Sequence, residues 1–215
     1  MKGLSRGVDF REACVVEALA VVAESGVHSL SLREVARRLG VSHQAPYKHF
    51  ASRDHILAEI VRRAFDHFAA ALDARPRSLD LVKDSRSMGR AYVDYALEHP
   101  LEYQLMFGAP LPPPERHPEM MRSARHAFSL LRDDLARVFA ASGAPEGAID
   151  LDSEALFVWA AVHGLASLQA TEAMGTLDLP PGTRERMREH MLDRIGAALG
   201  VAPPALSPQP RGSPE

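Results

Sequence analysis

The sequence predicts an all-α protein, with a small N-terminal unit of three helices followed by a larger helical body. Apolar residues recur at helical spacing through most of the 215 residues, for example at Val15, Ala18, Leu19 and Val22. No convincing alternation of apolar and polar residues indicates strands, and no period of roughly 20–50 residues indicates a solenoid. A helical bundle is therefore expected.

The N-terminal unit begins with a helix expected at residues 9–24. Gly26 ends it, at the position where a left-handed backbone costs glycine least. The segment SLREVARRLG follows, in which Ser31 caps a second helix and Glu34, three residues on, completes the pattern of a capping box. Gly40 stops this second helix.

A third helix, short and unusual in composition, is expected to begin near Ser42 in the segment VSHQAPYKHF. If Ser42 caps it, Pro46 stands at about its fourth position and removes only the first intrahelical hydrogen bond. Phe50 then faces the core. Two short helices joined by a turn with glycine form the pattern of a helix-turn-helix, whose second helix enters the major groove of DNA.

The third helix carries side chains suited to nucleic acid. Tyr47 and His49 can donate hydrogen bonds to phosphates, and Lys48 adds a positive charge. The end that meets base edges in a recognition helix carries Ser42, His43 and Gln44. A solvated helix face is the alternative interpretation, but the capped helices, the glycine turn and the local charge together favour DNA binding.

The charge distribution agrees with contact to a polyanion at one place. The formal net charge of −3 argues against a protein that coats nucleic acid over its whole surface. Residues 31–53, however, hold five basic side chains and one acidic side chain, Glu34. The basic ones are Arg33, Arg37, Arg38, Lys48 and Arg53. A local basic patch on an acidic chain is typical of a nucleic-acid-binding segment.

The remaining helices are expected at residues 52–73, 78–99, 99–107, 118–142, 152–174 and 183–199. Ser78 caps the second of these, and Gly108 ends the third. A proline-rich loop follows Gly108, and a tail with five prolines at residues 201–215 is expected to be disordered. We therefore divide the chain into a DNA-binding domain at residues 1–55, a larger helical body at residues 56–200, and the tail.

Composition and targeting signals indicate a cytoplasmic protein with no membrane association. The single cysteine, Cys14, excludes an intramolecular disulfide and fits a reducing compartment. It stands among apolar residues, which predicts a buried thiol. The N-terminus lacks the apolar segment of a signal peptide, and no apolar run reaches the length of a membrane span.

Residues 10–60 closely resemble the DNA-binding domain of TetR-family transcriptional regulators, through the segment ALAVVAESGVHSLSLREVARRLGVSHQAPYKHFASRDHIL. The resemblance implies a dimeric, ligand-responsive repressor whose first three helices bind operator DNA and whose helical body, residues 56–200, is a ligand-binding and dimerisation domain. By position, Tyr47, His49 and Arg53 would contact phosphates; Arg53 stands where the family usually has lysine. The resemblance also implies that Ser31 and Arg33 approach the DNA, and that base preference is set by Ser42, His43, Gln44 and Lys48.

The segments HPLEYQLMFG and WAAVHG resemble the C-terminal domain of one TetR subgroup, often called the WHG domain. Trp159, His163 and Gly164 supply that motif. TetR-like bodies usually enclose a cavity, so the resemblance implies a pocket for a small effector, although the subgroup does not identify the effector.

Large apolar side chains of the body suit an apolar or aromatic effector. The candidates are Tyr103, Met106, Phe107, Phe128, Phe157 and Trp159, with His163 or Gln169 as the polar contact. For each apolar residue, simple core packing is the alternative. For His163 the alternative is a hydrogen-bonded core histidine.

A two-fold homodimer is expected through the last two helices. In EALFVWAAVHGLASLQA the apolar residues extend almost all the way round the helix, too far for one buried stripe. Ala160, Ala161 and Gly164 permit close approach of a partner helix. The other half of a four-helix interface would come from Met187, Met191, Ile195 and Ala198.

Ten histidines raise the question of a metal site. His43, His49 and His55 are six residues apart, which does not place pairs on one helical face. Neither a cysteine partner nor a His-x-x-x-His spacing is found for His117, His126, His163 and His190. The sequence therefore predicts no metal and no cofactor.

An enzyme is not expected, because the sequence has no glycine-rich phosphate loop after a strand and no nucleophile elbow. Two alternatives to a ligand-released repressor stay open. The first is a DNA-binding regulator without a small effector, either constitutive or controlled by a protein partner. The second is an enzyme or small-molecule carrier with a vestigial helix-turn-helix.

Overall fold

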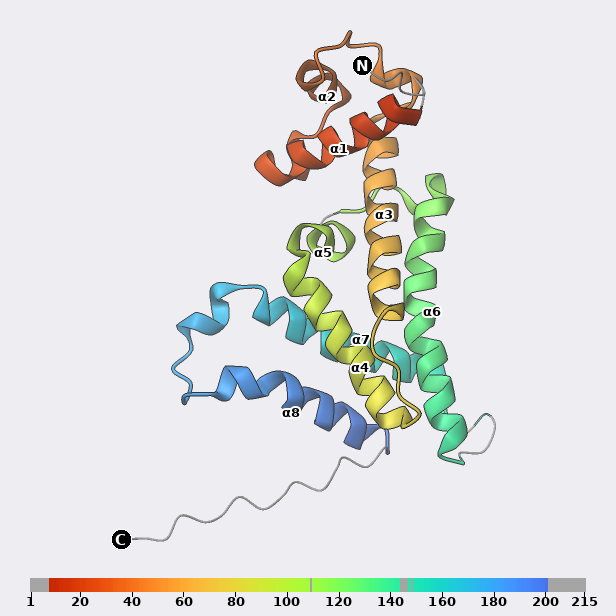
Figure 1. Cartoon of the computed structure of the whole chain (residues 1–215), viewed down its shortest axis with the longest axis vertical. Helices are drawn as coiled ribbons and strands as arrows, with labels where there is room; N and C mark the ends of the chain where they lie inside the picture. Colours follow the sequence, from red (N-terminus) through yellow and green to blue (C-terminus); the bar gives the residue numbers. More distant parts are fainter. Residues whose placement is uncertain (1–7, 109, 144–146, 148, 201–215) are drawn as a thin grey trace. The chain divides into compact units, whose positions relative to one another are not determined.

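The computed structural model describes residues 8–108, 110–143, 147 and 149–200, and within these the fold is all-α, as predicted (Figure 1). The α-helices are α1 (Val8–Ser25), α2 (Leu32–Arg38), α3 (Arg53–Asp73), α4 (Leu81–Glu98), α5 (Pro100–Phe107), α6 (Pro118–Ala141), α7 (Leu151–Gln169) and α8 (Thr183–Ala198). Short 3-10 helices are η1 (Val27–Ser29), η2 (Pro46–Lys48), η3 (Pro114–Arg116) and η4 (Glu172–Thr176). The tail expected at residues 201–215 lies outside the described residues. Among those described, none of the helices is both long and apolar enough to cross a membrane.

The chain forms two compact units. The first combines Met1–Ala74 with Glu98–Leu130, and the second combines Arg75–Leu97 with Leu131–Glu215. This division groups α3 and α5 with the N-terminal helices, because α3 packs on α1 and also on α5. The functional boundary between residues 55 and 56 is a different kind of division and stays a prediction.

The core of the first unit forms where α1 and α2 pack on α3. Cys14, Val35 and Ile56 are fully buried, and Leu30 and Phe50 are almost so. Burial raises the pKa of the Cys14 thiol, which is therefore a protonated core group, as its apolar neighbours in the sequence predict. α1 and α2 bury one face each, and α3 buries residues along its whole length.

An ionic cluster holds α1 against α3. The Glu59 carboxylate accepts hydrogen bonds from Arg11 at 3.2 Å, from Arg62 at 3.0 Å and from Arg63 at 2.9 Å. Arg63 in turn bonds Glu12 of α1 at 2.7 Å. Burial alone would raise the pKa of Glu59, but the arginine hydrogen bonds outweigh it and hold that pKa at about 2. The carboxylate is therefore charged wherever the fold is intact near neutral pH.

Helix ends follow the sequence in some places and not in others. The Ser31 hydroxyl accepts from the Glu34 amide at 3.1 Å, so the predicted cap of α2 is confirmed. The predicted cap of α4 was wrong: Asp80, rather than Ser78, accepts from the amides of Val82 and Lys83. Both serine and aspartate are good caps, and only the path of the chain after Pro76 decides between them.

The helix expected at residues 152–174 is shorter than predicted. Asp150 caps its start by accepting from the Ser153 amide at 3.2 Å, and α7 ends at Gln169. The following residues form the separate 3-10 helix η4. Apolar spacing continues past Gln169, which is why the sequence alone extended the helix.

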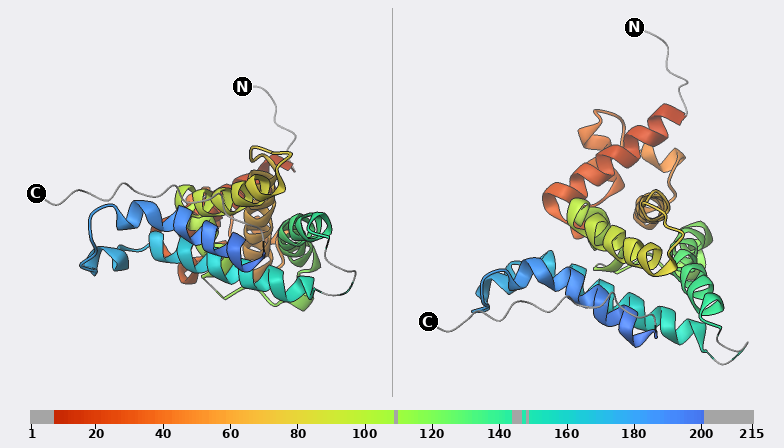
Figure 2. Two further views of the ribbon diagram at one scale, coloured as in Figure 1. Left: turned by 90° about the horizontal axis from the view of Figure 1, so that it is seen from below. Right: turned by 60° about the horizontal axis from the view of Figure 1, so that its bottom comes forward.

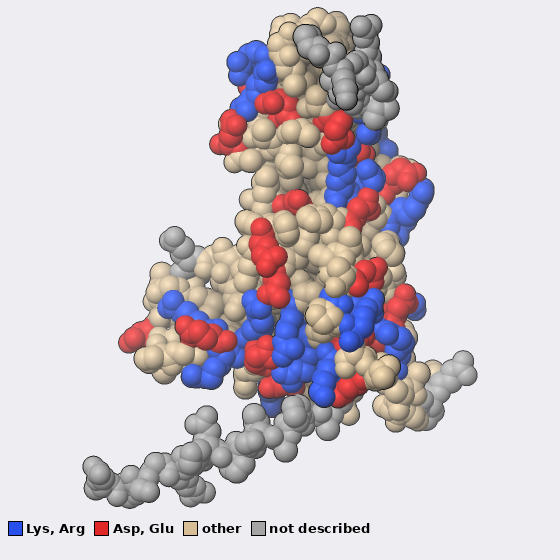
Figure 3. Space-filling model, in the orientation of Figure 1, with Lys and Arg blue, Asp and Glu red and all other residues tan. Residues whose placement is uncertain are grey.

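In the second unit, α7 and α8 lie side by side and antiparallel, in Figures 1 and 2 alike. α8 also packs on α4, where Gly89 leaves room for the Leu192 side chain. Charged side chains join these two helices: Arg86 and Arg90 both bond Glu189, at 2.9 and 2.8 Å. Figure 3 shows the resulting mixture of basic and acidic groups over α4 and α8.

A buried arginine joins α4 to α6 in the second unit. The Arg75 side chain is 0% exposed, and its Nη2 donates to Asp84 at 3.2 Å and to Asp134 at 3.1 Å. Burial lowers the pKa of Arg75 and raises that of Asp134. Arg137, half-exposed, adds a bond to Asp134 at 2.5 Å. The cluster keeps two carboxylates inside the unit because a guanidinium lies between them.

We predict that Arg75→Met lowers the free energy of unfolding by about 3–5 kcal/mol, because it leaves two buried carboxylates without their central partner. Arg137→Ala is the matched control, and it should cost about 1 kcal/mol or less because half of that side chain is in water. Urea unfolding at neutral pH measures both. Equal losses in the two variants would contradict the central role of Arg75.

Candidate nucleic-acid interface

The predicted recognition helix is not an α-helix. Residues 42–49, all of them described and here called the recognition segment, form turns followed by η2. Pro46 has no amide hydrogen to give to the Ser42 carbonyl, which accepts instead from the Ala45 amide at 2.9 Å. The tighter i to i+3 pattern continues with the His49 amide on the Pro46 carbonyl at 3.0 Å. The prediction that Pro46 lies within a short α-helix beginning near Ser42 was therefore wrong.

The recognition segment turns its polar side chains outward. Ser42, His43, Gln44 and Lys48 are exposed, and Tyr47 is 45% exposed. On the inner side Pro46 is buried and Phe50, just after the segment, is 2% exposed. The turn thus exposes an amide, an imidazole, a phenol and an ammonium group on one short segment. The buried side chains of Pro46 and Phe50 hold that segment in place.

Aromatic contacts with α1 fix the end of the recognition segment. The His49 ring lies 5.4 Å from the Phe10 ring, between centroids, and the Arg11 guanidinium lies 5.1 Å above the Phe50 ring. Both contacts come from the start of α1. A 3-10 turn has little stability of its own, so these contacts determine its orientation.

Arg53, predicted to contact phosphate, has a structural task that the sequence did not reveal. Its Nε donates to the Leu30 carbonyl at 3.1 Å and its Nη2 donates to the Val27 carbonyl at 2.7 Å. These bonds tie the first residue of α3 to the segment just before α2. The phosphate contact stays a prediction, and it would involve the partly exposed Nη1, which also lies 3.4 Å from Asp54 Oδ1.

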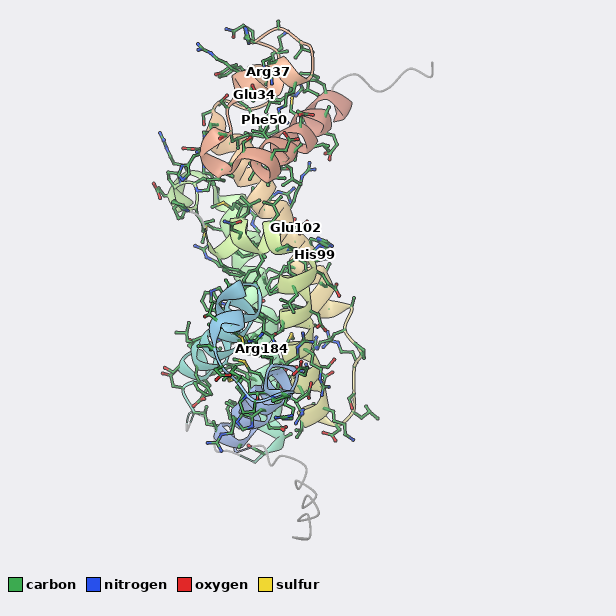
Figure 4. All side chains as sticks on the ribbon, turned by 90° about the vertical axis from the view of Figure 1, so that its left-hand side faces the viewer. Glu34, Arg37, Phe50, His99, Glu102 and Arg184 are labelled. Carbon is green, nitrogen blue, oxygen red and sulfur yellow. The ribbon has the colours of Figure 1, made fainter. Side chains whose placement is uncertain are left out.

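The basic patch of residues 31–53 is smaller than its count of charges suggests. Glu34 binds Arg37 at 2.6 Å and Arg38 at 2.9 Å, and these two arginines hold the pKa of Glu34 at about 2 (Figure 4). Arg33 and Lys48 are exposed and form no ion pair with any residue that the structure describes. Arg33 and Lys48 are therefore cations of the patch that no acidic partner among the described residues neutralises.

The predicted effector residues are divided between the two units. In the first unit, Tyr103 is 7% and Met106 is 2% exposed. The Phe107 ring contacts Phe65 at 5.8 Å and Tyr103 at 5.0 Å, between centroids. These contacts favour the core-packing alternative for all three residues of α5. Phe128 of α6, also in the first unit, is partly buried.

In the second unit, Trp159 and His163 form a hydrogen-bonded group with Tyr92 of α4. The Trp159 indole donates to the Tyr92 hydroxyl at 3.1 Å, and that hydroxyl lies 3.1 Å from His163 Nδ1. Burial lowers the pKa of His163, which favours a neutral ring. Its Nδ1 then accepts a hydrogen bond from the Tyr92 hydroxyl. The structure thus agrees with the alternative of a hydrogen-bonded core histidine.

A groove of about 610 Å³ lies at one end of the second unit. It is lined by Leu97, Gln169, Thr171, Met174, Gly175, Thr176 and Arg184. Of the predicted effector residues, Gln169 alone is among these lining residues. Its Oε1 is buried and has no hydrogen-bond partner among the described residues. The other lining residues come from α4, from Thr171 and the η4 helix that follows it, and from α8, and nothing in their spacing along the sequence points to a common site.

The outer side of α7 is an exposed apolar surface. Leu156 is 52%, Phe157 45% and Leu168 46% exposed. At helical spacing they share one side with Ala160, which is exposed, and with Gly164, where a Cβ would meet nothing within 4 Å. We call these five residues the α7 surface. Among the other predicted interface residues, Ala198 is exposed, Ala161, Met187 and Met191 are partly buried, and Ile195 is only 7% exposed, so Ile195 belongs mainly to the core of its own chain.

Comparison with known protein families matches both parts of the chain. Residues 15–60 match the family described as "Bacterial regulatory proteins, tetR family". Residues 85–195 match the domain described as "Tetracyclin repressor-like, C-terminal domain". The first match contains α2, the recognition segment and Arg53, and the second contains the Trp159–His163 group and the α7 surface.

Similar proteins carry related descriptions. "HTH-type transcriptional regulator Mb1846" of Mycobacterium bovis and "HTH-type transcriptional regulator Rv1816" of Mycobacterium tuberculosis are each 35% identical over 115 residues, which are 49% of this chain and 48% of the relative. The match therefore spans about half the length of these relatives. Both are named as regulators and not as enzymes.

Solved structures agree on the fold. A protein of unknown function from Rhodococcus sp. RHA1 is 27% identical with a TM-score of 0.74, over 92% of this chain and 98% of that one. A transcriptional regulator from the same source is 24% identical with a TM-score of 0.64, over 90% and 99%. The C-terminal match alone covers more than half of the residues, and the N-terminal match covers the helix-turn-helix. The chain accordingly belongs to the TetR family of bacterial transcriptional regulators.

Proposed function

We propose that the protein is a homodimeric transcriptional repressor that binds a palindromic operator and is released by a small apolar or aromatic effector. The observation that carries DNA binding is the recognition segment, whose exposed polar side chains stand on a turn anchored by Pro46 and Phe50. If the segment were only a solvated surface, its irregular turn would not need to be anchored by buried side chains. The anchoring therefore favours DNA binding.

Within the recognition segment, position divides the side chains between two roles. His43 and Gln44 lie at its start and are assigned to base edges, together with Ser42 and Lys48. Tyr47 and His49 lie at its end and are assigned to phosphates, which position the protein without specifying sequence. Ser31, Arg33 and the exposed part of Arg53 would add backbone contacts from the neighbouring elements.

The α7 surface supports the proposed dimer. Its exposed leucines and phenylalanine would be covered by the same surface of a second copy, and Ala160 and Gly164 allow close approach of the two helices. Met187, Met191 and Ala198 would extend the contact from α8. Two-fold symmetry then requires the recognition segments to lie about 34–36 Å apart, one turn of the DNA helix.

The groove at Gln169 supports the proposed effector site. Leu97 and Met174 give it apolar walls, and Arg184 adds a cation at the start of α8 (Figure 4). The unpaired Gln169 Oε1 requires a hydrogen-bond donor, which a ligand would supply. These features favour an apolar molecule that bears a hydroxyl or amide and an anionic group.

A DNA-binding regulator without a small effector, constitutive or controlled by a protein partner, remains the second candidate. The two candidates agree on the operator and differ only in release. The test measures binding of the full chain to the DNA upstream of its own gene by electrophoretic mobility, with and without candidate ligands. Binding distinguishes both regulators from a protein with a vestigial helix-turn-helix, and release by a ligand distinguishes the two regulators from each other.

We predict that Tyr47→Phe and Gln44→Ala have opposite signatures. Tyr47→Phe removes a phosphate hydrogen bond and should weaken binding to operator and unrelated DNA alike, by roughly 5–10-fold. Gln44→Ala should change the preference at one base pair of each half-site by about 1–3 kcal/mol. Fluorescence anisotropy on a set of single-base operator variants measures both. A sequence-specific loss in Tyr47→Phe would refute the division of roles.

We predict that Phe157→Arg converts a dimer into a monomer. It places two like charges face to face in a desolvated two-fold contact, while leaving the side chain in water within the separate chain. Leu79→Arg is the matched control, because Leu79 is fully exposed yet lies outside α7 and α8. Sedimentation at micromolar concentration checks the masses. A wild-type monomer, or a dimer that survives Phe157→Arg, would count against this interface.

We predict that Gln169→Leu abolishes the response to effector without weakening operator binding. The test screens aromatic and aliphatic carboxylic acids that also bear a hydroxyl or amide group, for those that raise the melting temperature and release operator DNA from the wild-type chain. Such compounds should lose at least about tenfold in affinity for Gln169→Leu, because the ligand's donor then faces a hydrocarbon. Compounds that act equally on both proteins bind elsewhere, and the absence of any active compound would favour the second candidate.

A further inference from the structure

Three metal-binding side chains converge in the first unit, outside both the recognition segment and the groove. They are His67 of α3, His99 at the start of α5, and Glu102 in the first turn of α5. One ligand atom from each lies within 4.8 Å of the other two. Figure 4 shows His99 and Glu102 next to each other. None of the three belongs to the histidine spacings that the sequence singles out, since His67 and His99 are far apart along the chain.

The positions of these side chains are fixed from both helices. His67 Nδ1 lies 2.8 Å from Glu102 Oε2, and the rings of His67 and His99 are 4.7 Å apart between centroids. His99 and Glu102 are three residues apart and therefore on the same side of α5. At the other end of α5 the Phe107 ring packs on Phe65 and Phe68 of α3. The two backbones are thus held together independently of the cluster.

We propose that His67, His99 and Glu102 bind a divalent transition-metal ion, of which Zn²⁺ is the representative. Two imidazoles favour Zn²⁺, Ni²⁺, Co²⁺ or Cu²⁺, whereas Mg²⁺ and Ca²⁺ prefer sites built from oxygen alone. Three protein ligands leave a coordination position for water, as in open zinc sites. The inference concerns α3 and α5 alone and does not depend on the proposed effector.

The geometry needs only a small adjustment. Bonds of about 2.0–2.2 Å place the ligand atoms of a tetrahedral ion about 3.3 Å apart. The His67–Glu102 pair is already closer than that, at 2.8 Å. The His67 side chain is 51% exposed, so rotation of its ring brings the set together without moving the core. His67 and Glu102 by themselves would form an ordinary hydrogen-bonded pair at the surface. The presence of His99 as a third ligand distinguishes a metal site from such a pair.

A bound ion would hold α3 and α5 together through His67, His99 and Glu102. α3 begins at Arg53, whose hydrogen bonds hold the segment before α2, and His67 lies near its other end. Binding therefore stabilises the first unit by mass action, and the gain in stability grows with the logarithm of the ion concentration relative to the dissociation constant. Metal binding also changes the affinity for DNA if the spacing of α3 and α5 differs between the DNA-bound and DNA-free states.

The test titrates the full chain, stripped of metal by a chelator, with Zn²⁺ against a competing chromophoric chelator. One ion per chain should bind, and His67→Gln, His99→Gln and Glu102→Gln should each lower the affinity by at least about tenfold. His126→Gln is the matched control, because His126 is an exposed histidine on α6 of the same unit. It should bind Zn²⁺ as the wild type does.

A second measurement needs no substitution: in the wild-type chain, the imidazole NMR signals of His67 and His99 should shift on addition of one equivalent of Zn²⁺, ahead of the other histidines. This keeps the proposal testable even where a variant unfolds. No binding at micromolar Zn²⁺, equal binding by all variants, or first shifts at other histidines would each overturn the proposal.

Discussion

The first unit depends on α3 being one continuous helix that several segments use as their support. Its first residue holds the stretch before α2 through the Arg53 hydrogen bonds to the carbonyls of Val27 and Leu30. Its middle holds α1 through Glu59 and three arginines, and its last turns hold α5 through aromatic rings. The 3-10 turn of the recognition segment has little stability of its own, so its orientation depends on the contacts that Phe10 and Arg11 of α1 make with His49 and Phe50.

The second unit is organised by different physics. Its helices α4 and α6 meet at a guanidinium placed between two buried carboxylates, and α4 and α8 meet through surface arginines and acids. Buried charge contributes strongly only because each member compensates the others, whereas the exposed pairs are individually weak. The outside of α7 differs from both kinds of contact, because Leu156, Phe157 and Leu168 are exposed there in a single chain.

Several residues that the sequence predicts to contact DNA or an effector make structural contacts within the protein. Arg53 is at a position suited to phosphate, yet two of its donors bind backbone carbonyls. Arg37 and Arg38 add to the count of positive charges, yet Glu34 pairs with both. Tyr103, Met106 and Phe107 are large and apolar, but side-chain size does not distinguish a pocket wall from core, since both require burial. In each case the competing partner is distant in sequence or on the next helical turn.

The sequence by itself determined the all-α fold, the extent of most helices, the cap at Ser31 and the family, because these depend on periodicity and on residues within a few positions of one another. Only the tertiary structure decided that Asp80 rather than Ser78 caps α4, that Pro46 turns the recognition segment into a 3-10 helix, and that Gln169 lines a groove. It alone brings His67 beside His99 and Glu102. The physical reason is that such sites join separate helices, and the relative positions of helices are set by packing, which leaves no local pattern in the chain.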